Sequence, residues 1–285
     1  MKVKNVFKTV SIVLAILLVL TACQNALPHR AQWWFDAIEC RYDVTAGQGL
    51  SIALIDSGID VSHPDLKDCD IETIDLLAID QDSDMQHGTA MAGVICAKPN
   101  DENGLIGIVP GVKIYDIRAV DSTGSCDNSV LVQAINIAID KQVDLINISI
   151  GTKTASLELE TAIRDAIESN IIVVAATSNA GSEEIIYPAA YAGVVKVIPV
   201  NKRGGYLYGL TIPEGERYIK APGQSIVTTM GSADRLYGSF DGTSIATAIT
   251  SGVIARAIYE NPKAERNQLV SKLYEQNILC VSKIW

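Results

Sequence analysis

The chain of 285 residues has few aromatic side chains (6%), only 3 histidines, and no internal repeat or low-complexity run. It also lacks any basic cluster, and its formal charge is −10, from 33 acidic against 23 basic residues. An acidic chain without a basic patch lacks the electrostatic footprint of a nucleic-acid-binding protein, so we expect no nucleic-acid partner. With 48% hydrophobic residues, the composition is that of a globular protein and excludes a disordered or collagen-like one.

Cysteines are few, and none of them forms a CxxC motif. Without that spacing, nothing signals a zinc ribbon or a thioredoxin-type redox site. If Cys23 is modified, as argued next, the five that remain cannot all pair with one another. We therefore expect mostly unpaired, buried thiols among the cysteines at positions 40, 69, 96, 126 and 280.

The most apolar run of the chain lies near its N-terminus. Lysines at positions 2, 4 and 8 precede an apolar stretch over residues 10–20, which is too short for a good membrane span. The stretch ends in Leu20-Thr21-Ala22-Cys23, which resembles the lipobox of bacterial lipoproteins. The resemblance implies that residues 1–22 are a signal peptide and that Cys23 is lipidated.

Two alternatives to a lipoprotein stay open: an ordinary signal peptide and an uncleaved anchor, with Cys23 incidental in both. All three interpretations export the chain. Removing residues 1–22 makes the remainder still more acidic, which argues against adsorption to anionic lipid. We therefore expect a protein on the extracytoplasmic face of the cell membrane, held there only by its lipid anchor.

Beyond residue 50, apolar strands alternate with helical patterns. Continuous apolar runs at residues 50–55, 113–118, 143–148, 171–176 and 194–199 predict strands buried on both faces, as in a parallel sheet. Residues 129–141 and 157–169 have apolar side chains at helical spacing. This alternation predicts an α/β fold with a doubly wound, mostly parallel sheet flanked by helices.

No Pro/Gly-rich linker divides the chain. We expect a lead-in over residues 23–47 and one domain over residues 48–285. In the lead-in, Trp33-Trp34-Phe35 predicts a short amphipathic helix packed on that domain. In the domain, a functional site is expected at the carboxyl ends of the strands.

Four polar residues stand where such a site would form. Asp56 follows the first strand, His87 opens an apolar helical run, Asn179 lies in a loop after a strand, and Ser244 enters an apolar helix. Each has an ordinary alternative role, as a turn aspartate, a core histidine, a loop asparagine or a helix N-cap serine. A helix N-terminus and a side-chain amide are, however, both suited to stabilising a developing oxyanion.

Taken together and in order, these segments resemble the subtilisin family of serine proteases (peptidase S8). The resemblance covers about residues 48 to 260 and rests on six ordered segments: residues 52–66, His87-Gly88-Thr89, residues 147–151, Tyr187-Pro188-Ala189, Ala221-Pro222-Gly223 and Gly242-Thr243-Ser244. It implies that Ser244 is the nucleophile, His87 the general base and then acid, and Asp56 the residue that orients the imidazole. Asn179 and the Ser244 backbone N–H would bind the oxyanion, and no cofactor is required for this chemistry.

The same resemblance implies where a polypeptide substrate lies. Ser149, Ile150 and Gly151 would pair with the substrate backbone, and Gly124 and Ser125 would form the opposite edge, so that an extended peptide is held by strand addition. Ile186 would lie at the base of the S1 pocket, where it favours small or medium apolar P1 residues.

Calcium is a cofactor of the family. Asp65 matches a family calcium ligand, and the oxygen donors Asn100, Asp101 and Asn103 lie where a calcium loop is found. A solvated acidic loop is an equal alternative, so a structural calcium ion is an expectation only.

The sequence thus predicts an exported, monomeric serine endopeptidase that acts through an acyl-enzyme. Cys23 stands 33 positions before Asp56, which leaves no room for the folding pro-domain usual in secreted subtilisins. Related proteases without that domain include leader peptidases, so a dedicated leader-peptide processing enzyme is expected. The alternatives are a non-catalytic peptide-binding lipoprotein on the same fold and a peptide ligase or macrocyclase.

Overall fold

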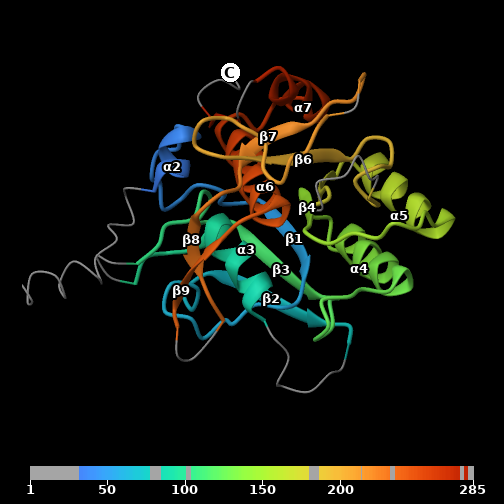
Figure 1. The fold of residues 1–285 in the computed structure, drawn as a ribbon. Helices are drawn as coiled ribbons and strands as arrows, with labels where there is room; N and C mark the ends of the chain where they lie inside the picture. The colour runs from blue at the N-terminus through green and yellow to red at the C-terminus, as the bar shows by residue number, and fades with distance from the viewer. Residues whose placement is uncertain are drawn as a thin grey trace, which may run out of the picture.

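A computed structural model describes residues 32–77, 85–100, 104–179, 186–212, 214–231, 235–276 and 279–281. Their centre is a seven-stranded sheet in the order β2-β3-β1-β4-β5-β6-β7, in which every neighbouring pair is parallel. The predicted signal peptide and Cys23 lie outside the described residues. The predicted doubly wound parallel sheet is confirmed (Figure 1).

The strands that were predicted appear with nearly the expected bounds. They are β1 (Ser51–Asp56), β3 (Lys113–Arg118), β4 (Leu145–Ile148), β5 (Ile172–Ala176) and β6 (Val195–Val200). Two further strands, β2 (Asp70–Asp75) and β7 (Ile219–Pro222), form the edges of the sheet. The apolar-run criterion missed them because β2 has charged residues and no fully buried position, and because Lys220 and Pro222 interrupt β7.

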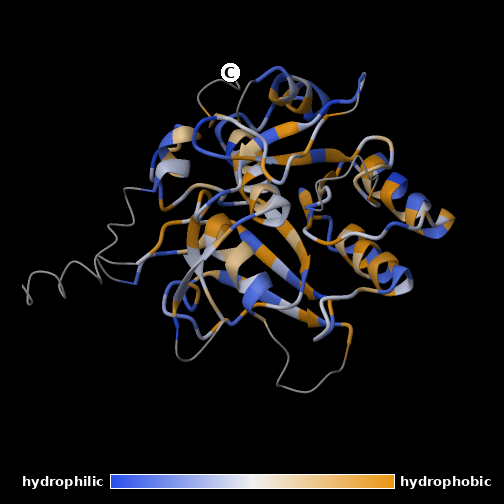
Figure 2. Cartoon of the chain, in the orientation of Figure 1, coloured by the Kyte–Doolittle hydropathy of each residue, from blue (hydrophilic) through white to orange (hydrophobic). Residues whose placement is uncertain are grey.

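Helices cover both faces of the sheet. On one face lie α3 (Gln86–Cys96) and α6 (Thr243–Glu260), and on the other lie α4 (Asn128–Asp140) and α5 (Leu157–Glu168). Strand β1 shows why: Ile52 and Leu54 pack with α3 and α6, whereas Ala53 and Ile55 pack with α4 and α5. Strands β1, β4 and β5 in the middle of the sheet are therefore apolar at most positions, as Figure 2 shows.

Smaller elements complete the fold. The helix expected in the lead-in is α2 (Trp33–Ala37), whose Trp34 is buried, and α7 (Arg266–Tyr274) packs near the C-terminus. An antiparallel pair is formed by β8 (Ile226–Thr229) and β9 (Tyr237–Phe240). Among the described helices, none is long and apolar enough to cross a membrane.

Strand order determines where a site can form. From β1 the chain passes to β2 and β3 on one side of β1, and from β3 it crosses to β4 on the other side, so the direction in which strands are added reverses at β1. In doubly wound sheets the crevice at such a reversal, outside the carboxyl ends of the strands, is where ligands bind. Asp56 is the last residue of β1 and therefore stands at this point.

Candidate active site

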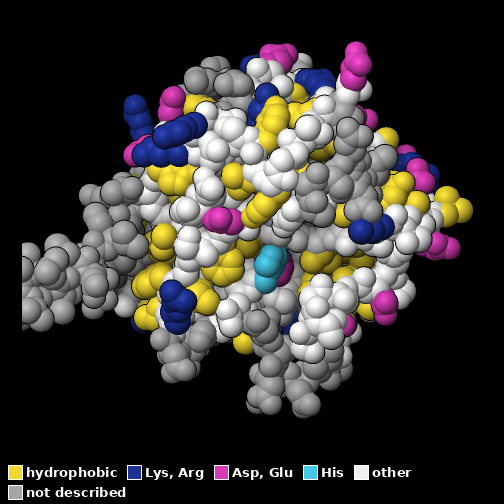
Figure 3. Space-filling view, in the orientation of Figure 1, with side chains coloured by type: hydrophobic (Ala, Val, Ile, Leu, Met, Phe, Trp, Pro, Cys, Tyr) yellow, Lys and Arg dark blue, Asp and Glu magenta, His cyan; other side chains and the backbone are white. Residues whose placement is uncertain are grey.

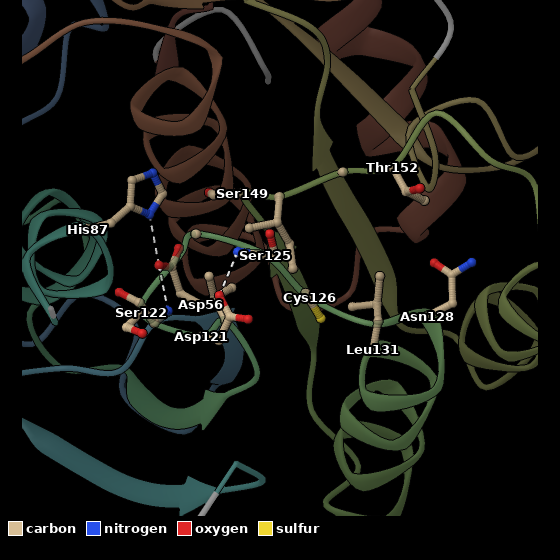
Figure 4. Close-up of a pocket in the computed structure, with 15 residues that line it drawn as sticks. Asp56, His87, Asp121, Ser122, Ser125, Cys126, Asn128, Leu131, Ser149 and Thr152 are labelled. Carbon is tan, nitrogen blue, oxygen red and sulfur yellow. Dashed lines mark hydrogen bonds and ion pairs between the residues drawn. The ribbon is translucent and has the colours of Figure 1, made fainter. Parts of the chain in front are cut away.

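Asp56 and His87 are in direct contact. The Asp56 side chain is fully buried, and its Oδ1 accepts hydrogen bonds from the Ser57 N–H and from His87 Nδ1, both at 2.7 Å. The His87 side chain remains 41% exposed, so it reaches from a buried carboxylate to solvent. Figure 4 shows this contact, and Figure 3 shows a cyan histidine in a hollow of the surface.

A glycine allows this contact to form. His87 lies in the first turn of α3, and the next residue, Gly88, packs directly on the loop that follows β1. A Cβ atom at Gly88 would lie 2.3 Å from the Gly58 carbonyl oxygen, which is too close for any side chain. The Gly88 N–H also donates to Ser57 Oγ at 3.2 Å. Glycine therefore lets the start of α3 approach the end of β1 closely enough for His87 to meet Asp56.

Ser244 lies on the other wall of the site, in the first turn of α6. The residue before this helix, Gly242, has φ 127°, a conformation that favours glycine. The half-buried Ser244 donates its hydroxyl hydrogen to the Ser149 carbonyl at 3.1 Å, and Ser149 Oγ donates to the Ser244 carbonyl at 3.3 Å. These reciprocal bonds attach the start of α6 to the segment that follows β4.

A buried asparagine supports that attachment. Asn147, on β4, is fully buried, and its Nδ2 donates to Ser149 Oγ at 3.0 Å. Its Oδ1 accepts from Ser251 Oγ, on α6, at 2.8 Å. Because both ends of the amide are bonded, β4 and α6 are held in one relative position. Sequence reasoning gave Asn147 no role, although an asparagine inside an apolar strand is a signal of a buried polar network.

The Asn179 amide has a defined orientation. Its Oδ1 accepts from the Thr243 backbone N–H at 2.8 Å and lies 3.0 Å from the Thr243 hydroxyl, which also donates to the Thr177 carbonyl. Because an N–H must face an acceptor, these bonds identify the oxygen end of the amide. The Asn179 Nδ2 group is consequently the end available to a ligand.

Two pockets meet at the segment formed by Ser149, Ile150 and Gly151. One, of about 530 Å³, is also lined by Asp56, His87, Gly124 and Ser125 (Figure 4). The other, of about 460 Å³, is also lined by Asn179, Ile186 and Ser244. The structure thus brings every predicted catalytic and substrate-binding residue to one of two adjoining pockets, which share the 149–151 segment and together are called the groove below.

Ile186 is held against this segment. A Cβ atom at Gly151 would lie 2.2 Å from Ile186 Cγ2, so the isoleucine occupies the space beside a bare backbone. Next to them, the Thr152 and Tyr187 backbones exchange two hydrogen bonds of 2.8 Å. These bonds keep Ile186 in the wall of the smaller pocket.

The buried carboxylate Asp116 lies near Asp56 but belongs to β3. Its Oδ2 accepts from the Thr73 hydroxyl at 3.0 Å and from the Ile59 N–H at 3.2 Å, and its Oδ1 is buried without a partner. Burial raises the pKa of Asp116 to about 7 against the lowering effect of the two hydrogen bonds, and the Asp56 charge adds to the rise. Sequence reasoning missed this group, because β3 also contains Lys113 and Arg118 and an aspartate does not stand out among them.

Cys126, which lines the larger pocket, is not poised as a nucleophile. Burial, together with the charges of Asp127 and Asp121, raises the pKa of its thiol to about 12. A thiol with such a pKa stays protonated at neutral pH and reacts slowly. Cys126 is therefore no candidate for the nucleophile of this site.

The predicted calcium loop is only partly within the described residues, because Asp101 and Asn103 lie outside them. Asp65 is buried, and its oxygens accept from the Asn100 N–H at 3.0 Å, the Leu105 N–H at 2.7 Å and the Tyr237 hydroxyl at 2.9 Å. In the described part of the chain, no three His, Cys, Asp or Glu residues cluster as metal ligands. Asp65 thereby holds the backbone at Asn100 and at Leu105. Calcium binding stays a prediction.

Comparison with known proteins gives consistent similarities. A family model described as the subtilase family of peptidase S8 matches residues 47–279. The subtilisin of Bacillus pumilus is 34% identical over 232 residues, which cover 80% of this chain and 83% of that protein. Subtilisin E of Bacillus subtilis strain 168 is also 34% identical over 232 residues, but this chain spans only 60% of its length. The minor extracellular protease Epr of the same strain is 33% identical over 252 residues, 87% of this chain and 38% of Epr.

Solved structures agree on the fold. Sphericase has a TM-score of 0.72 at 27% identity, covering 86% of this chain and 90% of its own. A mutant of the protease domain of PatA has a TM-score of 0.75 at 24% identity, covering 86% of this chain and 96% of its own. At that identity the second similarity concerns the fold alone.

Proposed function

Because this chain belongs to the subtilase family, we propose that it is a serine endopeptidase with Asp56, His87 and Ser244 as its catalytic triad. The observation that carries the proposal is the 2.7 Å contact between His87 Nδ1 and the buried Asp56 carboxylate. A carboxylate in this position holds the proton on Nδ1 and leaves Nε2 as the basic nitrogen. It also stabilises the imidazolium that forms when His87 accepts a proton.

The reaction begins when the Ser244 hydroxyl leaves the Ser149 carbonyl and donates to His87. Catalytic hydrogen bonds of this kind often form only when substrate is bound. Ser244 Oγ attacks the scissile carbonyl as His87 takes its proton, and His87 then returns that proton to the departing amine. Water, activated by His87, attacks the acyl-enzyme and releases the second product with Ser244 regenerated.

We propose Asn179 Nδ2 and the Ser244 backbone N–H as the oxyanion donors. The Thr243 N–H binds Asn179 Oδ1, so the amide can only present its nitrogen to the substrate. Ser244 stands in the first turn of α6, where N–H groups lack partners within the helix and the dipole is positive. Donors arranged before the reaction stabilise the tetrahedral intermediate without reorganisation.

The groove suggests how a peptide is bound. An extended substrate would lie between the 149–151 segment and the 124–125 edge and would form strand-like backbone hydrogen bonds with them. Its P1 side chain would enter the smaller pocket, where Ile186 fills space beside Gly151. Because a β-branched side chain has a stiff χ1, this wall would yield little to a large aromatic P1 residue.

Selectivity of this kind suits a processing protease, so we propose a dedicated peptide, such as the leader of a precursor, as the natural substrate. We also propose export and lipid attachment at Cys23, on the lipobox-like residues 20–23. Similarity to the extracellular protease Epr supports export. We also propose a structural calcium ion, and only Asp65 and the oxygen donors Asn100, Asp101 and Asn103 support it.

The test is covalent labelling with a fluorophosphonate probe, followed by product analysis on peptides. Wild type should be labelled, whereas Ser244→Ala should be neither labelled nor active and should keep the melting temperature of a folded domain. Ser169→Ala, which changes an exposed serine at the end of α5, is the matched control and should keep full labelling. Cleavage by Ser244→Ala at the wild-type rate would refute the triad assignment. Joined rather than hydrolysed peptide products would indicate a ligase.

A further inference from the structure

Two cysteines that are far apart in the sequence lie close together at the C-terminal end of α3. Cys96 is the last residue of α3 and is fully buried, and the half-buried Cys69 lies in the turn just before β2. Cys69 Sγ lies 3.0 Å from the Cys96 carbonyl oxygen and 3.6 Å from the Asp65 carbonyl oxygen. Its sulfur is therefore at the end of the helix that carries the other thiol.

The backbone already holds these two segments together. The Lys98 N–H donates to the Asp65 carbonyl at 2.9 Å, and the Cys69 N–H donates to the Leu66 carbonyl at 3.0 Å. The Lys98 ammonium adds a bond of 2.8 Å to the Asp68 carbonyl. These bonds hold the segment that contains Cys69 next to the end of α3, which contains Cys96.

The thiols also affect one another. Hydrogen bonding with the Cys96 thiol lowers the pKa of Cys69, whereas the same contact and burial raise the pKa of Cys96 well above its usual value. The 3.0 Å approach of Cys69 Sγ to the Cys96 carbonyl oxygen brings the two residues into this contact. In contrast, Cys40 and Cys126 direct their sulfurs at the carbonyl of the next residue in sequence.

We infer that Cys69 and Cys96 are a redox-active pair that closes into a disulfide when the chain meets a disulfide oxidant. The half-buried Cys69 thiolate attacks one sulfur of the oxidant, forms a mixed disulfide and releases one thiol. Cys96 then loses its proton, attacks the Cys69 sulfur and releases the second thiol. The two cysteines lose two electrons and two protons, and the oxidant is reduced to two thiols.

The bond would clamp the segment between residues 69 and 96, which contains β2 and α3. His87 lies near the opposite end of α3 from Cys96, nine residues and therefore about 14 Å away along the helix. At that distance the disulfide takes no part in the chemistry. It would instead restrict the unfolded chain and oppose local opening of the helix that carries His87.

The inference takes its oxidising surroundings from the proposed export, but its test does not depend on peptidase activity. The full mature chain is equilibrated in oxidised or reduced glutathione, quenched in acid, alkylated after denaturation and digested for mass spectrometry. Oxidation should remove Cys69 and Cys96 from the alkylated pool and yield one peptide that joins them. The melting temperature should rise by roughly 5–10 °C on oxidation, from a loop of this length in a domain of this size.

Variants separate the pair from the other thiols. Cys69→Ser should lose both the joined peptide and the rise in melting temperature, whereas Cys126→Ser should retain both. Full alkylation of Cys69 and Cys96 in oxidised glutathione would overturn the inference, as would a bond from Cys69 to any other cysteine. A joined peptide without a change in melting temperature would overturn the clamping role. Fluorophosphonate labelling of the same samples reports on the proposed peptidase function separately.

Discussion

Replacing Asp116 by asparagine should change how the stability of this protein depends on pH. Asparagine is nearly isosteric, and its Oδ1 can accept the Thr73 and Ile59 hydrogen bonds that the carboxylate accepts now. Its Nδ2 would take the place of the buried oxygen that lacks a partner. That substitution has a fixed, pH-independent effect on stability, whereas the carboxyl group titrates.

The direction of the change in stability with pH depends on whether the folded or the unfolded chain binds the Asp116 proton more tightly. Burial raises the pKa of Asp116 from its ordinary 3.8 to about 7, so the folded chain keeps this proton at pH values where the unfolded chain has lost it. The resulting stabilisation is fully present below pH 4, declines as pH rises to about 7, and is absent above that. The asparagine variant has no such decline.

The magnitude can be worked from the same pKa. Each pH unit between 5 and 7 removes about 1.4 kcal/mol from wild type relative to the variant, or about 3 kcal/mol in total. For a domain of this size, that corresponds to a relative change in melting temperature of about 6–12 °C. The whole relative change in melting temperature should occur below about pH 7.5, because the Asp116 carboxyl of the folded chain is ionised at higher pH.

The assay is thermal unfolding by circular dichroism at pH 5 to 9, in an inactive Ser244→Ala background that prevents self-cleavage. Asp121→Asn is the matched control, because hydrogen bonds from Thr123 and Ser125 lower the pKa of Asp121. It removes a carboxylate that is ionised throughout this range, so its difference from wild type should be flat. If the melting temperatures of wild type and of Asp116→Asn changed with pH in parallel, the reasoning would be refuted.

Three other expectations concern catalysis, specificity and attachment. Asn179→Ala should lower kcat by about 10²–10³, the loss known for the equivalent donor in subtilisin, with KM little changed. A large rise in KM at constant kcat would make Asn179 a binding residue instead. Ile186→Gly should raise kcat/KM for Phe relative to Ala at P1 by about 10-fold or more in a P1-varied peptide series, and an unchanged ratio would remove Ile186 from S1. Cys23→Ser should move the mature chain from the membrane to the soluble fraction. Wild type found wholly soluble and without acyl mass on Cys23 would contradict lipidation.

Much of the fold was predictable because the central strands are buried on both faces. Burial on both faces demands apolar residues at successive positions, and the runs that contain β1, β4, β5 and β6 largely have that pattern. Strand β3 has it only in part, because Lys113, Asp116 and Arg118 stand among its apolar residues. The edge strands β2 and β7 were not predictable in this way. A strand at the edge of a sheet is recognised by the neighbour it pairs with, which a local pattern does not contain.

The candidate site, too, was only partly predictable from the sequence. The identities of Asp56, His87 and Ser244 and their order along the chain were readable, because they sit in short motifs at element ends. By itself, then, the sequence determined which residue types stand at those ends and which strands are fully buried. Their convergence was decided by the tertiary structure: Gly88 packs on Gly58, Asn147 bonds to both Ser149 and Ser251, and Thr243 orients Asn179. The buried carboxyl of Asp116 and the meeting of Cys69 with Cys96 have the same origin. Distance, burial and hydrogen-bond partners are properties of packing between segments far apart in the chain, and packing is what sets a pKa or brings two sulfurs together.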